Sequence, residues 1–131
     1  MDTVNPILGD LGRSLVEATA AHAAGDRAAV EAVLERASRF AGRLMDTVGG
    51  GSSMGTRVGE DTMSLYTQIE TIELDGPRDV IFEALGRAIA LTITVGQVAN
   101  GPNPFARVPG TDTFEDDAVV PAVGPRSVVR A

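Results

Sequence analysis

The chain has 131 residues, 44% of them hydrophobic, and its 18 acidic and 11 basic residues give a formal net charge of −7, which suits one acidic domain with its own core. The chain has no cysteine, which excludes disulfides and thiolate metal sites. All of its basic residues are arginines, and the absence of lysine excludes Schiff-base catalysis and a phosphate-loop lysine. The acidity and the 4% aromatic content also argue against nucleic acid as a partner.

The N-terminal segment predicts a helix over residues 6–24. Asn5 followed by Pro6 is typical of a helix start. An asparagine side chain can cap the helix, and the fixed φ angle of proline suits the first helical position. Its acidic start and early proline do not match a signal peptide, so we expect that the protein is not secreted. We expect it in the cytoplasm or within a protein assembly such as a virion. No apolar run reaches the roughly 20 residues of a membrane span, so no membrane contact is expected.

A second helix follows a tight turn in which Gly25 ends the first helix and Asp26 caps the next. Apolar residues keep the 3.6-residue helical period from Val30 to Val48. Because the connection is short, the two helices are expected to form an antiparallel αα-hairpin that buries their apolar stripes together.

Three arginines form a basic ridge on this second helix. Arg36, Arg39 and Arg43 follow the spacing i, i+3, i+7, which places them near one another on its surface. One interpretation is a solvated face paired with Glu35. The other is a partner-binding surface for acidic groups, including those of another copy of the chain.

A glycine-rich connector over residues 49–60 includes the stretch GGGSSMGTR. Gly50 and Gly55 have the spacing of a phosphate-binding loop, but Thr56 follows where that motif has lysine, and the preceding segment is helical rather than a strand. A flexible connector is the favoured interpretation, with Gly49 ending the second helix. A small phosphate-ligand-binding enzyme that uses this loop is the alternative function.

Two further elements follow the connector. Residues 62–74 fit a helix, and the pattern over 77–101 is helical with a second half that is apolar nearly all round, which indicates a central buried helix. Strands near 64–74 and 91–99 are the alternative. The expected fold class is therefore mainly α, an αα-hairpin plus one or two further helices in a small bundle, with an α+β fold as the alternative.

Catalytic and metal-binding side chains are scarce. His22 is the single histidine, and we expect it to help end the first helix rather than to act as a base. Glu17 and His22 are five residues apart, not the three of the Glu-x-x-His di-iron motif, so neither a metal nor another cofactor is expected. The chain is not expected to be an enzyme.

Residues 102–131 contain five prolines and predict an extended C-terminal arm beyond a helical domain at 1–101. Such an arm suits contact with neighbouring subunits and is expected to add little to the stability of the domain. The arm residues expected to contact a partner are Phe105, Phe114, Val119, Val120, Val128 and Val129.

The expected function is a non-enzymatic structural or interaction subunit of a larger protein assembly. A homo-oligomer, a virion or another shell would suit this composition, and self-association is the expected partnership. An acidic regulator that binds a basic protein surface is a further alternative.

Overall fold

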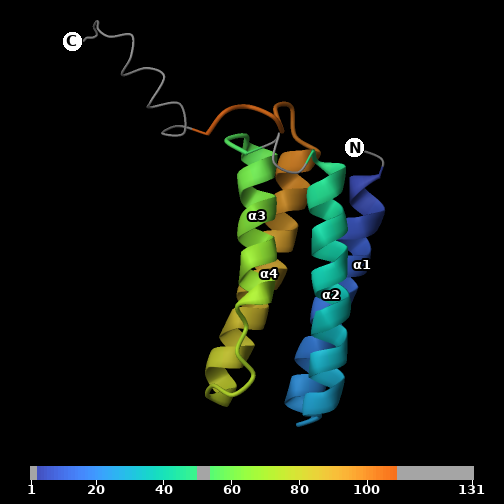
Figure 1. Ribbon diagram of the computed structural model, residues 1–131, viewed down its shortest axis with the longest axis vertical. Coiled ribbons are helices and arrows are strands. Elements are labelled where there is room, and N and C mark those ends of the chain that lie inside the picture. Colours follow the sequence, from blue (N-terminus) through green and yellow to red (C-terminus); the bar gives the residue numbers. More distant parts are fainter. Residues whose placement is uncertain (1–2, 50–53, 109–131) are drawn as a thin grey trace, which may run out of the picture.

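The computed structural model of the chain describes residues 3–49 and 54–108, and nearly all of this part is helical. The four helices are α1 (Val4–Ala23), α2 (Arg27–Thr47), α3 (Arg57–Glu70) and α4 (Arg78–Ala99) (Figure 1). The prediction of a mainly α fold is confirmed. The alternative strands are not formed: α3 includes residues 64–70, and residues 91–99 all lie in α4.

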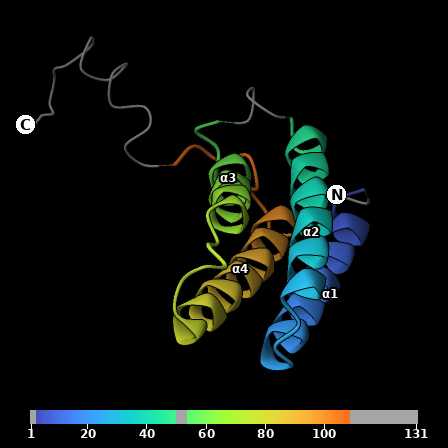
Figure 2. The same cartoon turned by 60° about the horizontal axis from the view of Figure 1, so that its bottom comes forward.

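The helices form an antiparallel bundle in which each helix packs against two others. The packed pairs are α1 with α2, α2 with α3, α3 with α4, and α4 with α1. Figures 1 and 2 show α2 and α3 on one side of the bundle and α1 and α4 on the other. Short connections force successive helices to run in opposite directions, so the predicted αα-hairpin of the first two helices is confirmed.

The core consists of apolar side chains from all four helices. Its largest fully buried residues include Leu11 and Leu15 of α1, Leu44 of α2, Leu65 of α3 and Leu85 of α4. Burial of each such side chain stabilises the fold by about 1.5 to 3 kcal/mol before the loss of conformational entropy is counted.

Glycine and aspartate set the ends of the first two helices as predicted. Gly25 and Gly49 have φ values of 76° and 107°, which favour glycine because a Cβ is strained there. The Asp26 carboxylate accepts a hydrogen bond from the backbone N–H of Ala29 at 3.1 Å, so Asp26 caps α2.

The predicted start of α1 is wrong by two residues. The helix begins at Val4, and Asn5 lies inside its first turn, where its side-chain amide pairs with the side chain of Asn100 at the end of α4. Pro6 is tolerated because the first N–H groups of a helix have no partner within the helix.

The start of α3 also differs from the prediction, since residues 57–60 belong to the helix rather than to the connector. Thr56 is the cap: its hydroxyl accepts a hydrogen bond from the N–H of Gly59 at 3.2 Å. The carbonyls of Ala106 and Pro104 accept hydrogen bonds of 2.9 Å from the N–H groups of Arg57 and Val58. The first residues of the predicted arm therefore lie against α3 and supply partners that this helix end needs.

Candidate protein-binding surface

An apolar groove of about 720 Å³ lies between α1 and α4 on the outside of the bundle. Its lining residues are Leu8, Gly9, Gly12, Arg13, Val16, Glu17 and Ala20 of α1, with Ile89, Thr92 and Ile93 of α4.

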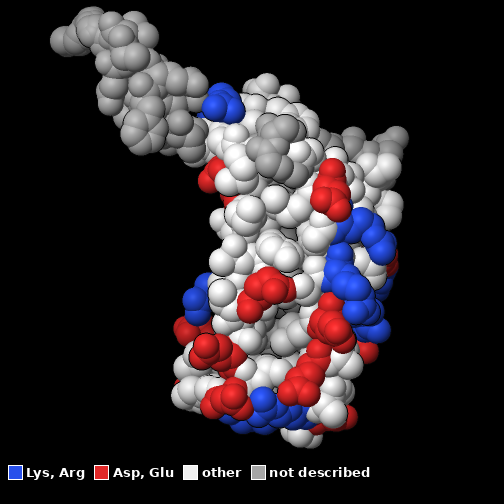
Figure 3. Space-filling view, in the orientation of Figure 1, with Lys and Arg blue, Asp and Glu red and all other residues white. Residues whose placement is uncertain are grey.

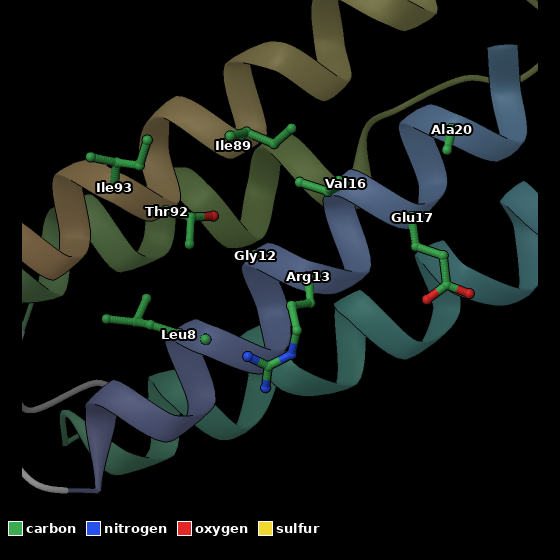
Figure 4. Close-up of a pocket in the computed structure, with 10 residues that line it drawn as sticks. Leu8, Gly12, Arg13, Val16, Glu17, Ala20, Ile89, Thr92 and Ile93 are labelled. Atoms are coloured by element: carbon green, nitrogen blue, oxygen red, sulfur yellow. The ribbon is translucent and has the colours of Figure 1, made fainter.

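The two ends of the groove are formed by branched apolar side chains. Figure 4 shows Val16 and Ile89 projecting toward each other at one end. Leu8 and Ile93 lie at the other end, with Gly12 and Thr92 between the two pairs. Val16 and Ile93 are each 58% exposed, the highest values among the large apolar residues in the described part of the chain. The groove is therefore a hollow flanked by exposed β-branched side chains.

The groove exists because α4 is apolar on more sides than the bundle covers. Residues 88–101 contain no charged residue. The prediction of a central buried helix is wrong, because α4 is one of four outer helices and packs only on α1 and α3. Its remaining face includes Ala90 and Ile93, which are exposed.

Charged side chains stand along one edge of the groove. The Arg13 guanidinium pairs with the Asp10 carboxylate, and the Glu17 carboxylate lies 2.6 Å from the guanidinium of Arg36 on α2. Figure 4 shows Arg13 and Glu17 pointing away from α4, toward the α2 side. The charges thus form a rim and leave the hollow apolar.

The predicted basic ridge lies along α2, where Figure 3 shows basic side chains gathered on this face of the molecule. Arg36 pairs with Glu17, Arg39 lies 3.9 Å from Glu35, and the Arg43 guanidinium stands 5.5 Å from the centroid of the Phe40 ring. Exposed ion pairs of this kind add little stability, about 0 to 1 kcal/mol. Their role toward a partner stays a prediction.

The predicted arm residues fall into two groups. Phe105 is 50% exposed on the segment that covers the start of α3, and it is not among the residues that line the groove. Five others lie outside the residues that the structure describes: Phe114, Val119, Val120, Val128 and Val129.

The glycine-rich stretch leads into a helix end whose N–H groups already have partners. The N–H groups of Arg57, Val58 and Gly59 are bonded to the segment 104–106 and to Thr56, and the N–H of Gly55 donates to the Glu60 carboxylate at 2.9 Å. A phosphate bound at a helix start needs these donors. Residues 50–53 of the stretch lie outside the described part.

His22 joins the end of α1 to the start of α4. Its Nε2 lies 3.0 Å from the carbonyl oxygen of Arg78, and its ring packs edge-on against Phe82 with 4.4 Å between centroids. Arg78 in turn donates to the carbonyl of Ala23 at 2.8 Å, where a cation is favoured by the helix dipole. These contacts tie two helix ends together.

Within residues 3–49 and 54–108, no three His, Cys, Asp or Glu side chains are grouped so as to hold a metal ion. No helix in the same ranges is both long enough and apolar enough to cross a membrane. Fold and groove together define a small antiparallel four-helix bundle with an apolar groove on its α1/α4 side. Comparison with known protein families, curated proteins and solved structures finds no match for the chain.

The groove residues were not predicted as a site from the sequence. The feature of the sequence that could have revealed the groove is the apolar character of α4 on nearly all sides, which we interpreted as complete burial. A small bundle offers no central position that would cover a whole helix, so the second apolar face of α4 had to be exposed.

Proposed function

We propose that this protein is a non-enzymatic, self-associating subunit of a larger protein assembly, and that the groove between α1 and α4 is its association surface. The observation that carries the proposal is the exposure of Val16 and Ile93, 58% each, on either side of an apolar hollow. Exposed apolar residues that gather in one place and are rimmed by polar groups mark protein–protein contact sites.

The chemistry of the groove supports binding rather than catalysis. Its two charged residues, Arg13 and Glu17, are paired with Asp10 and Arg36 at the rim. The Thr92 hydroxyl is bonded to the carbonyl of Ala88 at 2.8 Å within its own helix. A reaction would need a nucleophile or a base that faces the substrate, and the lining residues of the groove offer neither.

The C-terminal arm retains its proposed role as a second contact with neighbouring subunits. Phe105 supports this role because half of its surface is exposed to solvent. Its neighbours Pro104 and Ala106 are hydrogen-bonded to the start of α3, so the exposed ring has a fixed place on the surface. The groove and the arm would then bind at two separate surfaces, as a subunit with several neighbours requires.

The test is the mass of the full chain in solution, measured by sedimentation equilibrium from low to high micromolar concentration. We expect species heavier than the 13.6 kDa monomer, and we expect Ile93→Glu to lower the average mass with unchanged helicity because it removes the groove contact. Val80→Glu is the matched control, because Val80 is 49% exposed on the same helix but does not line the groove. A protein that stays monomeric over this range, or that responds equally to both substitutions, would contradict the proposal.

A further inference from the structure

We infer that the occupant of the groove is the same groove of a second copy, packed about a two-fold axis with the two α1 helices antiparallel. This inference rests on the proposed function and adds the identity and geometry of the contact. It follows from three properties of the groove: its polar content, its shape and the order of charges along its rim.

The polar content favours a helical occupant over an extended one. An extended segment laid in the groove would turn half of its backbone N–H and C=O groups toward side chains that are apolar, apart from Thr92 and the rim charges. Buried backbone groups without partners are costly. A helix satisfies its own backbone groups, so helices of a second copy fit this surface better than the chain's own C-terminal arm.

The shape is self-complementary along α1. Gly12 leaves a hollow, and Val16 projects one turn further along the same helix (Figure 4). Antiparallel pairing of two α1 helices about a point between these residues sets Val16 of each copy over Gly12 of the other. A two-fold contact of this kind needs a projection and a matching hollow on the same surface.

The rim charges follow the same symmetry. The pairing that places Val16 over Gly12 also brings Arg13 of each copy toward Glu17 of the other. Both side chains are largely exposed, at 75% and 60%, and their present ion pairs are weak enough to exchange. Opposite charges one turn apart on α1 are therefore complementary to those of a second copy in an antiparallel two-fold contact.

The size of the surface predicts a weak dimer. Two helices of about 30 Å, each about 10 Å wide, present roughly 600 Å² per copy, or about 1,200 Å² in total. This value is at the lower end for specific stable interfaces, so we expect a dissociation constant in the micromolar range.

The first experiment is cross-linking of single-cysteine variants of the full chain with a short bismaleimide, which is specific because the natural chain has no cysteine. Val16→Cys is expected to give a covalent dimer in high yield, and Val80→Cys little. The yield should be unchanged when Val16→Cys is combined with truncation after Val108. If truncation abolishes the Val16→Cys product, the contact at the groove depends on the arm and the inference is wrong.

The second experiment compares Gly12→Ala with Gly42→Ala. A Cβ at Gly12 would lie 4.0 Å from the Thr92 methyl carbon and one at Gly42 would meet nothing within 4 Å, so both variants fit the monomer. Gly12→Ala is expected to raise the dissociation constant at least several-fold because it fills the hollow that receives Val16, whereas Gly42→Ala, on α2, should leave it unchanged. Equal constants for the two variants would overturn the two-fold geometry.

Different results would contradict the two-fold contact and the proposed function. If Ile93→Glu abolishes association but Val16→Cys does not cross-link, the groove associates with another surface and only the two-fold inference is wrong. If the full chain is monomeric at every concentration, the proposed function fails and the inference with it.

Discussion

Thr62 is fully buried on α3, and its hydroxyl has no hydrogen-bond partner among the described residues. A buried hydroxyl without a partner costs about 1 to 3 kcal/mol relative to its bonded state. Thr62→Val keeps the shape and removes this cost, so we expect the free energy of unfolding to rise by about 1 kcal/mol, measured by urea denaturation.

Thr92→Val provides the comparison for Thr62. Thr92 is also buried, but its hydroxyl donates to the Ala88 carbonyl at 2.8 Å, so the same substitution removes a hydrogen bond that is made. We expect no gain at Thr92, measured at a concentration where the chain is monomeric. If Thr62→Val brings no gain over Thr92→Val, the Thr62 hydroxyl has a partner after all.

Asp61 on α3 makes the stability of the fold depend on pH. Burial raises the pKa of its carboxyl above the ordinary value, and the nearby Arg57 offsets only part of this. Between the unfolded and folded pKa values the folded state binds more protons, so the contribution of Asp61 to stability falls as pH rises through this interval.

We therefore expect Asp61→Asn to be more stable than the natural chain at neutral pH, and the difference to vanish in acid below the ordinary pKa of aspartate. The measurement is thermal unfolding at a series of pH values. Asp46→Asn, on α2, makes the same change in net charge and serves as the control. A stabilisation that persists unchanged in acid would show that charge burial at Asp61 is not its cause.

The segment 102–108 has a larger part in the fold than its composition predicted. Pro104 and Ala106 supply carbonyls to the first turn of α3, at 2.9 Å each. A hydrogen bond of this kind adds about 0.5 to 1.5 kcal/mol. Truncation after Gly101 is therefore expected to lower the free energy of unfolding by about 1 to 3 kcal/mol, and truncation after Val108 to leave it unchanged.

Denaturant titration of the two truncated chains tests this expectation. Thr56→Ala, which removes the capping hydroxyl, should cost about 1 kcal/mol in the same assay. If truncation after Gly101 is as stable as truncation after Val108, the segment lies on α3 without stabilising it.

Helix ends were predictable from sequence where the partner is local. Gly25, Asp26 and Gly49 act within one turn of their own position, and all three were identified correctly. The start of α3 was misplaced although its capping residue, Thr56, is local. The other partners of its first N–H groups, Ala106 for Arg57 and Pro104 for Val58, lie 49 and 46 positions later, which no local pattern can reveal. Asn5 was misassigned for the same reason, since its partner is Asn100.

At the scale of the whole molecule, periodicity predicted which faces are apolar but not how many of them the bundle covers. The main apolar stripes of α1 and α2 matched the residues that these helices bury. α4 has two apolar faces, and the sequence alone did not indicate that Ile93 would be left exposed. The groove is thus a property of four helices together, and no single segment contains it.

The opposing effects of net charge and apolar contact make the association respond to salt. Two copies that each carry −7 repel one another, and this repulsion is screened as ionic strength rises, while contact through the groove is hydrophobic. We expect the dissociation constant to fall several-fold between about 0.02 and 0.5 M NaCl, where the Debye length shortens from about 20 Å to about 4 Å. Sedimentation equilibrium at both salt concentrations measures the change. An acidic regulator bound to a basic surface would respond in the opposite direction, so weaker association at high salt would favour charge rather than the groove as the source of binding.

The double variant Arg13→Glu with Glu17→Arg keeps the net charge and restores opposite charges across the proposed contact, whereas Arg13→Glu alone sets like charges against one another. The double variant should therefore associate more tightly than Arg13→Glu alone, above all at low salt, and a double variant no tighter than the single one would exclude this rim from the interface.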